Sequence, residues 1–304
     1  MKLVISGASG WLGREFIYSL LKNEELKSMD VMRLFSSSKK NIDFGEFGVV
    51  QSEAFLEMNP KDYAGTETFV HLAFLTRDLV DKYGVKEFLA INQELTNKAV
   101  EFIKVVKPKY VVNVSSGAVF DRASGKLENS PLINPYGFGK LQEEKNLLAA
   151  CEIAGSNISI GRLWGCTGEF MPINRAYALS DLIFTALTER RIRIKSKGRV
   201  IRRYCDAGEF MQLLHALSKE NRIKLINSGG PKIEIGDLAS LIAQFVGDLK
   251  IARELEPNST DDDYYPRDWD YEELSKLCNL PLSPIEEQVK KTILGHKNRL
   301  AALT

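Results

Sequence analysis

A glycine-rich turn near the amino terminus limits the folds open to this chain more than any other feature. The run SGASGWLG places Gly7, Gly10 and Gly13 between a short apolar stretch, KLVIS, and an amphipathic helical stretch. Glycine tolerates the positive φ of a sharp turn, and its missing side chain lets the backbone approach a pyrophosphate. The helix that follows offers free N–H groups and a positive dipole end to phosphates. An ordinary tight turn is the alternative, but this placement predicts a dinucleotide-binding site.

The remainder of the first half alternates apolar runs with helical stretches. Strands are indicated by VMRLFS, TFVHLAF, KYVVNVSS and ISIGRL, and VV near residue 49 is a further candidate. Strands that alternate with helices predict a doubly wound parallel sheet with helices on both faces, the Rossmann α/β fold. The second half is less regular and predicts a smaller α/β substrate-binding part. We expect a dinucleotide-binding domain over 1–163, with about 204–228 returning to it, and a substrate-binding part over 164–203 and 229–304.

Composition narrows the range of partners. The 304 residues include 41 basic and 40 acidic ones, a net charge of +1, which favours neither nucleic acid nor a membrane surface as partner. No apolar run has the length of a membrane span, and four scattered cysteines favour a reducing cytoplasm over a disulfide framework or a zinc site. The polar, acidic and aromatic run EPNSTDDDYYPRDWD, residues 256–270, predicts a surface loop. Its aspartates 261–263 have no accompanying histidine, so a solvated turn is favoured there over a metal site.

The end of the second strand bears on the choice of dinucleotide. A protein that binds NAD usually has an acidic residue there to hold the ribose hydroxyls. In the run RLFSSSKK that position falls on Phe35 or Ser36, and no carboxylate appears before Asp43. Ser36, Ser37, Lys39 and Lys40 offer hydrogen bonds and positive charge to a 2′-phosphate. The sequence therefore favours NADP over NAD, with a plain polar loop as the alternative.

The run NPYGFGK brings a tyrosine and a lysine to the start of a helix. Asn134 is a good helix N-cap and Pro135 a good first helical residue, so Tyr136 and Lys140 lie at i and i+4 on one face. A nearby ammonium is expected to lower the tyrosine pKa from about 10, so that the phenol exchanges a proton near neutral pH. Ser116 closes the preceding strand, at the edge where ligands bind in open parallel sheets.

Taken together, these motifs resemble the extended branch of the short-chain dehydrogenase/reductase superfamily, which includes NAD-dependent epimerases and dehydratases acting on nucleotide sugars. The resemblance covers nearly the whole chain, including HLA at residues 71–73 and Asn92 in the next helix. It implies Ser116 as carbonyl orienter, Tyr136 as proton donor or acceptor, and Lys140 as pKa modifier and ribose ligand. The implied cofactor contacts are Gly7, Ser9, Gly10, Trp11, Leu12, Gly13, Ser36, Ser37, Lys39, Leu72, Ala73, Phe74, Asn92, Tyr136 and Lys140.

The substrate half resembles the branch less closely. RLWGCTG keeps Arg162, Trp164 and Gly168 of the family segment but lacks its asparagine, and RRYCDAGEF places Arg202 where a substrate pyrophosphate is expected. The implied substrate contacts are Thr76, Ser116, Trp164 and Arg202. His71 is expected to be a packed structural histidine, and Cys166 small core filler.

Three functions remain open from the sequence. The first is reduction of a nucleotide-linked keto-sugar, with Tyr136 as proton donor. The second is epimerisation with tightly bound NAD, and the third is a non-catalytic dinucleotide sensor. The family's 4,6-dehydratases have Thr-Asp-Glu where this chain has Ser116-Gly117-Ala118, so dehydration is disfavoured. The resemblance also implies a homodimer formed through a four-helix bundle of the helices that contain LTNKAVEFIKVV and Tyr136.

Overall fold

The computed structural model of the chain describes residues 2–22, 32–121, 124–127, 130–173, 176–220, 224–256, 259–266 and 270–302. These residues form two compact units. The first comprises Met1–Leu163 with Met211–Ile226, and the second Trp164–Phe210 with Asn227–Thr304. Among the described residues, no helix combines the length and the apolar character that crossing a membrane requires.

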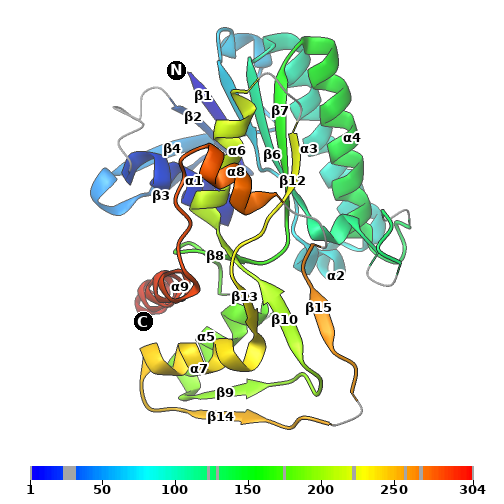
Figure 1. Cartoon of the computed structure of the whole chain (residues 1–304). Helices are drawn as coiled ribbons and strands as arrows, with labels where there is room; N and C mark the ends of the chain where they lie inside the picture. Colours follow the sequence, from blue (N-terminus) through cyan, green and yellow to red (C-terminus); the bar gives the residue numbers. More distant parts are fainter. Residues whose placement is uncertain are drawn as a thin grey trace. The chain divides into compact units, whose positions relative to one another are not determined.

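The first unit is built on one large sheet (Figure 1). Its strands lie in the order β12-β7-β6-β5-β1-β2-β4-β3. Their bounds are β1 Leu3–Ser6, β2 Met32–Ser36, β3 Lys40–Asp43, β4 Val49–Ala54, β5 Thr68–His71, β6 Tyr110–Ser116, β7 Asn157–Leu163 and β12 Lys224–Asn227. The run from β4 through β2, β1, β5 and β6 to β7 is parallel, whereas β3 pairs antiparallel with β4. This confirms the expected Rossmann sheet.

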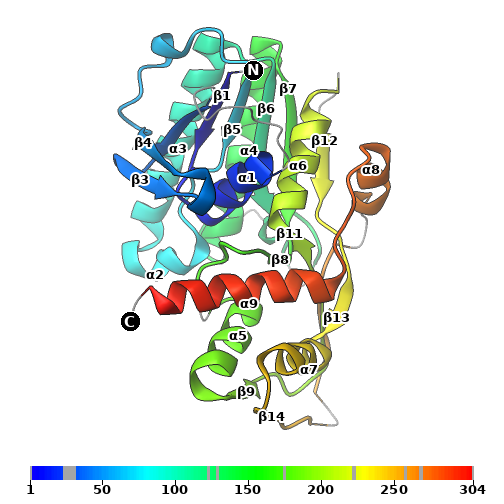
Figure 2. The same ribbon diagram turned by 90° about the vertical axis from the view of Figure 1, so that its left-hand side faces the viewer.

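Helices cover both faces of this sheet. Helices α3 (Val85–Val106) and α4 (Pro135–Ala154) lie on one face, and α1 (Trp11–Lys22) and the later part of α6 (Ala207–Ser218) on the other (Figures 1 and 2). The apolar cluster beneath α3 and α4 joins Phe102 and Leu147 to Phe69, Val111 and Ile158 of the strands. Apolar strand residues are buried on both sides, which is why their sequences lack the alternation of a half-exposed strand.

The helix that carries Tyr136 begins and ends where its local sequence predicts. The Asn134 side chain accepts a hydrogen bond from the Gly137 amide at 2.9 Å, and Pro135 is the first helical residue. At the other end Gly155 adopts a left-handed φ of 71° and closes the helix. Both signals are local, because a cap needs only the residues around it.

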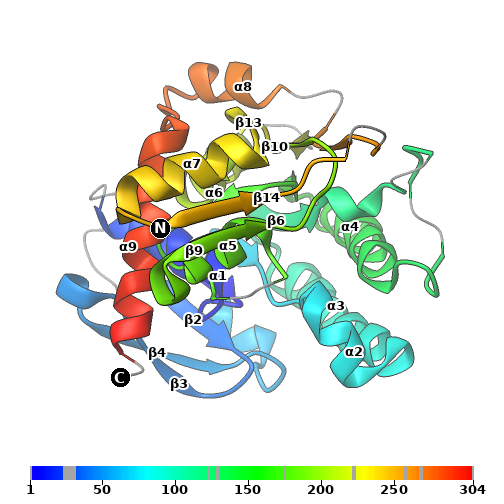
Figure 3. The ribbon, with the colours of Figure 1, turned by 90° about the horizontal axis from the view of Figure 1, so that it is seen from below.

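The second unit contains smaller sheets and four further helices in its described residues, together with the first turn of α6 (Figure 3). Its strands are β8 Cys166–Thr167, β9 Arg191–Ile194, β10 Val200–Arg203, β11 Cys205–Asp206, β13 Lys232–Glu234, β14 Lys250–Arg253 and β15 Asp262–Tyr264. Its helices are α5 Ala178–Glu189, α7 Ile235–Val246, α8 Tyr271–Leu277 and α9 Ile285–Ala301. The surface loop expected over 256–270 is wrong in part, because β15 pairs there with β10; residues 257–258 and 267–269 of that loop lie outside the described residues.

Candidate active site

The glycine loop joins β1 to α1 and has the geometry of a phosphate cradle. Gly7 has a φ of +74°, and a Cβ atom added by any other residue at this position would lie 2.6 Å from the Leu72 carbonyl carbon. A Cβ on Gly13 would lie 2.5 Å from the Gly7 oxygen, whereas one on Gly10 would meet only that oxygen, at 3.2 Å. Gly7 and Gly13 therefore let the loop and helix pack against neighbouring backbone, and Gly10 leaves the approach to the helix open. These three roles fit a dinucleotide pyrophosphate.

The end of β2 lies beside this loop, because the Ala8 amide donates to the Phe35 carbonyl at 2.9 Å. Ser36 is 2 % exposed, and its hydroxyl has no hydrogen-bond partner within the described residues. Ser37 and Lys39 are exposed, and Lys40 Nζ donates to Ser37 Oγ at 3.4 Å. Residues 36–40 thus place serine hydroxyls and two lysines, and no carboxylate, at the end of β2 that is expected to receive the ribose.

The loop after β5 contributes the next part of the site. His71 is fully buried, and its Nδ1 lies 2.7 Å from Ser6 Oγ, so it is the packed histidine that the sequence predicted. Asn92 of α3 accepts a hydrogen bond from the Leu75 amide at 2.7 Å and so holds the loop in place. Thr76 is exposed at the end of this loop. The substrate and cofactor contacts predicted for these residues remain predictions.

Ser116 and Tyr136 are brought together by the docking of α4 onto the turn that follows β6. The Ser116 hydroxyl accepts from the Ala118 amide at 3.1 Å, and Asn134 Nδ2 donates to the Ala118 carbonyl at 2.8 Å. A Cβ on Gly137 would lie 2.0 Å from that carbonyl oxygen, so only glycine permits this approach. The same docking leaves the Tyr136 phenol hydrogen-bonded to Ser116. Both residues lie at the carboxyl edge of the sheet.

The pKa of Tyr136 departs from the sequence-based expectation. Burial raises it to about 12, and the hydrogen bond from Ser116 only partly opposes that rise. The expected net lowering of this pKa is therefore wrong, and the phenol is protonated at neutral pH. The main physical reason is the desolvation of the phenol, and the Glu143 carboxylate adds to the rise.

Lys140 is held by partners that its motif does not reveal. Its Nζ donates to the Val114 carbonyl at 2.9 Å and to the Glu143 carboxylate at 2.8 Å, and the Phe74 ring centre lies 3.9 Å away. Sequence reasoning missed Glu143. A glutamate three residues after a helical lysine is a common surface pair, and only the fold shows that this one is 1 % exposed.

A second buried ion pair anchors the same helix. Arg162 of β7 donates to both oxygens of Glu144, Nε at 2.9 Å and Nη2 at 2.7 Å. The Arg162 guanidinium also lies 4.9 Å from the centre of the Phe120 ring. This bidentate pair ties α4 to the last long strand of the sheet and to the segment after Ser116, and so helps to fix the position of Tyr136.

The two predicted substrate residues of the second unit have partners within that unit. The Trp164 indole donates to Asn227 Oδ1 at 2.9 Å and lies 4.9 Å from the Tyr264 ring. Arg202 is paired with the Asp262 carboxylate at 2.8 Å and also donates to two backbone carbonyls. A pyrophosphate at Arg202 would have to share the guanidinium with Asp262. Cys166, expected as core filler, is 7 % exposed.

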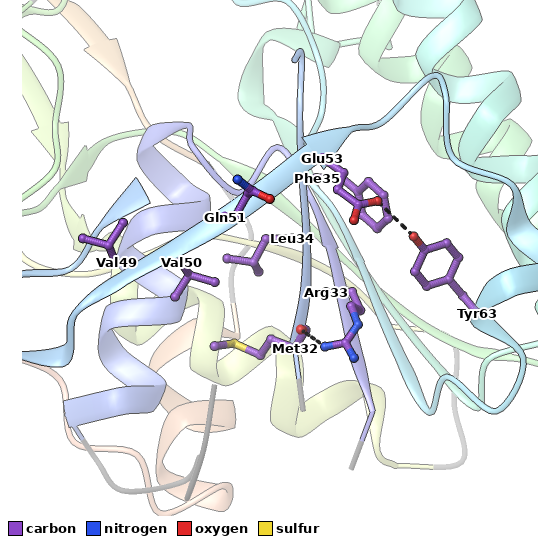
Figure 4. A pocket seen from close by; sticks show the side chains of 9 residues that line it. All are labelled: Met32, Arg33, Leu34, Phe35, Val49, Val50, Gln51, Glu53 and Tyr63. Carbon is purple, nitrogen blue, oxygen red and sulfur yellow. Dashed lines mark hydrogen bonds between the residues drawn. The ribbon is translucent and has the colours of Figure 1, made fainter. Parts of the chain in front are cut away.

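A pocket of ≈ 280 Å³ opens between β2 and β4, as Figure 4 shows. The two strands are paired only at Phe35–Glu53 and Ser36–Ala54, and they diverge towards their amino-terminal ends. Glu53 accepts a hydrogen bond from Tyr63 at its rim, at 3.3 Å. The pocket follows from this divergence, whereas the glycine loop and Tyr136 lie at the carboxyl ends of the strands.

Comparison with known proteins agrees with this geometry. The solved structures similar to the chain include an NAD-dependent NDP-hexosamine 5,6-dehydratase, TunA, with 16 % identity, a TM-score of 0.76 and 98 % of each chain covered. They also include UDP-N-acetylglucosamine 4-epimerase from Methanobrevibacter ruminantium M1, with 17 % identity, a TM-score of 0.77 and 98 % of each chain covered. At these identities the likeness shows the fold alone.

Sequence comparisons extend the likeness beyond the fold. UDP-glucuronic acid decarboxylase 3 of Arabidopsis thaliana is 22 % identical over 81 % of this chain and 75 % of its own length. A family model described as the NAD dependent epimerase/dehydratase family matches residues 3–229, which include the glycine loop, Ser116, Tyr136 and Lys140. The chain belongs to the NAD-dependent epimerase/dehydratase family.

Proposed function

We propose that the chain reduces a keto group on a nucleotide-diphosphate sugar, with Tyr136 as the proton donor. The observation that carries this proposal is the Tyr136 phenol, hydrogen-bonded to Ser116 and held in its acid form by burial. A group that stays protonated at neutral pH is suited to give a proton to a carbonyl oxygen rather than to take one from a hydroxyl. The neighbouring serine is suited to orient that oxygen.

The residues of the first unit divide the reaction between them. A bound nicotinamide dinucleotide supplies the hydride that adds to the carbonyl carbon. The Ser116 hydroxyl donates a hydrogen bond to the carbonyl oxygen, and the Tyr136 O–H gives that oxygen its proton. The products are an alcohol and the oxidised dinucleotide, and solvent returns a proton to Tyr136. Gly7, Gly10 and Gly13 would hold the pyrophosphate at the start of α1.

The end of β2 supports NADP as the preferred dinucleotide within this proposal. The buried Ser36 hydroxyl, which has no hydrogen-bond partner within the described residues, the exposed Ser37 and Lys39, and the half-buried Lys40 suit a 2′-phosphate better than an acidic side chain would. Titration of the protein with NADPH and NADH, followed by fluorescence, tests this preference. We expect tighter binding of NADPH, and a reversed preference in Ser36→Asp. Equal affinities in the parent chain would contradict the assignment.

Epimerisation with a resident cofactor is the second candidate, and some of the similar structures support it. One similar structure is described as MoeE5 in complex with UDP-glucose and NAD, and another as a 4-epimerase. An epimerase oxidises and then reduces the same carbon, so its cofactor stays bound. We therefore propose to denature the purified chain and identify released nucleotide by mass spectrometry. Stoichiometric NAD would support the epimerase, and NADP or an empty site that prefers NADPH would support the reductase.

The catalytic assignment has its own test. Tyr136→Phe removes the proton donor but leaves the ring, so turnover of 4-keto nucleotide sugars should disappear while dinucleotide affinity is retained. Ser116→Ala should also lower turnover by about 10²–10³-fold, the usual cost of removing one hydrogen-bond donor to the reacting oxygen. Turnover that survives Tyr136→Phe would refute the assignment. A chain that binds dinucleotide but turns over neither 4-keto sugars nor epimerase substrates would instead be the sensor.

We further propose a cytoplasmic homodimer formed through α3 and α4. The two helices pack side by side on one face of the sheet, and Val105 and Ile153 near their ends are 47 % and 72 % exposed. An interface along these two helices would cover both side chains. Sedimentation of the parent chain and of Ile153→Glu tests the proposal, which fails if the parent chain is a monomer at micromolar concentration.

A further inference from the structure

A buried charge network surrounds Lys140 and reaches well beyond the Tyr-x-x-x-Lys motif. An ammonium has three N–H donors. In Lys140 one is given to Val114 and one to Glu143, and the face of the Phe74 ring lies within reach of the third. The lysine side chain is 7 % exposed, and that of Glu143 is not exposed at all. The position of the ammonium is therefore fixed by the protein itself.

The network continues from Glu143 to β5 and β1. The second carboxylate oxygen of Glu143 lies 3.3 Å from His71 Nε2, and His71 Nδ1 lies 2.7 Å from Ser6 Oγ. Ser6 Oγ also accepts a hydrogen bond from the Leu72 amide, at 3.3 Å. With a proton on Nε2 the His71 ring faces the Glu143 carboxylate, and Ser6 can donate to Nδ1. Within the network, Lys140 and Glu143 form a pair of one positive and one negative charge.

Glu143 is ionised in this setting, and the part of the network from Glu143 to Ser6 is closed to water. Burial acts to raise the pKa of Glu143, but the Lys140 ammonium and the His71 hydrogen bond outweigh it and hold the pKa below its usual range. Ser6, His71 and Glu143 are each at most 1 % exposed, and the chain of contacts ends at a backbone amide. A proton has no exit along this path. The arrangement therefore balances charge and does not relay protons.

We propose that Glu143 is a positioning residue that fixes Lys140 on the Val114 carbonyl and offsets its charge, so that Tyr136 works as a proton donor. The inference rests on the proposed function, in which Tyr136 gives the substrate its proton. Besides Glu143, the charged groups that act on Tyr136 are Arg77 and Asp78, whose influences on the phenol are opposite in sign. With Glu143 in place, little positive field is left to stabilise a phenolate.

The first test measures the ionisation of Tyr136 directly and needs neither cofactor nor substrate. Tyrosine labelled with ¹³C at Cζ reports each phenol by NMR, and the resonance missing from Tyr136→Phe identifies the one of interest. In the parent chain we expect this phenol to stay protonated at about pH 10, where an ordinary tyrosine is half ionised. In Glu143→Gln the ammonium of Lys140 is no longer balanced, and the titration midpoint of the Tyr136 phenol should fall to about pH 10 or below. The exposed Glu152→Gln on the same helix is the matched control and should change nothing.

A second variant keeps the test decisive if Glu143→Gln does not fold. Lys140→Met with Glu143→Gln replaces the ion pair by neutral side chains of similar size, a change that buried pairs often tolerate. If Glu143 cancels the lysine charge, Tyr136 titrates alike in the parent chain and in this double variant. A parent midpoint well below that of the double variant, or no change in Glu143→Gln, overturns the inference. Loss of the proposed reductase activity alone would not move these midpoints, so the two proposals fail separately.

Discussion

His215 makes the stability of the first unit depend on pH, and the size of the effect can be worked out from its surroundings. This histidine of α6 is 2 % exposed and packs edge-on against Phe16 of α1, with ring centres 5.6 Å apart. Burial and the nearby Lys219 ammonium lower its pKa to about 3. Folded His215 is therefore neutral at every pH at which the protein is usually handled.

The sign and size of the effect follow from proton linkage. In the unfolded chain His215 has an ordinary pKa near 6.5, so between about pH 6.5 and pH 3 the unfolded state binds one more proton. The free energy of unfolding therefore falls as pH drops through this window and is unaffected above it. At pH 5, about 1.5 pH units below 6.5, the loss is about 2 kcal/mol at 1.36 kcal/mol per unit.

Urea unfolding at pH 7.5 and pH 5, followed by far-UV circular dichroism, measures this loss. The free energy of unfolding should drop between pH 7.5 and pH 5 by about 2 kcal/mol less in His215→Leu than in the parent chain. This variant keeps an apolar side chain against Phe16 but cannot take up a proton. Ile103→Val is the matched control. It should cost about 0.5–1.5 kcal/mol equally at both pH values, because it removes buried volume and no titrating group. An equal drop in the parent chain and in His215→Leu would refute the reasoning.

Other predictions concern the loop and the helix that build the site. In Gly13→Ala the new Cβ would lie 2.5 Å from the Gly7 oxygen, so we expect a loss of about 1–3 kcal/mol in a thermal melt together with weaker dinucleotide binding. Arg162→Ala leaves the Glu144 carboxylate buried and unpaired and should cost about 3–5 kcal/mol in urea unfolding, whereas Arg162→Met with Glu144→Leu should cost far less. The pH dependence of keto-sugar reduction should show no loss of activity from Tyr136 ionisation below about pH 10, and a fall centred near pH 7 would contradict the high pKa.

The parts of the fold that the sequence predicted are those set by local signals. Asn134, Pro135 and Gly155 fixed both ends of α4, because capping and positive φ depend only on neighbouring residues. The buried parallel strands were equally clear as apolar runs. The sequence did not reveal the short strands β3 and β15, because their residues, KNID and DDY, are mostly polar. Whether such a segment forms a strand depends on the neighbouring strands with which it pairs.

The site was predictable in its composition but not in its electrostatics. The sequence identified Ser116, Tyr136 and Lys140 as a set, and the structure brings Ser116 and Tyr136 into hydrogen-bond contact. It could not show the docking of Gly137 onto the Ala118 carbonyl, since that contact joins two segments on either side of a long loop. Nor could it show that Arg202, expected to be open to a phosphate, is already paired with Asp262.

The case of Lys140 shows why residue type and spacing leave the direction of proton transfer open. A Tyr-x-x-x-Lys pair fixes the distance along one helix face, but the pKa of the phenol depends on the net charge around it and on its burial. On our proposal, a carboxylate one turn further along the helix, in contact with a histidine from another strand, offsets the charge of the motif's lysine. The same motif with a small residue at position 143 would leave the ammonium unopposed and favour a phenolate. The protonation state of the tyrosine thus depends on its burial and on Glu143, neither of which the motif shows.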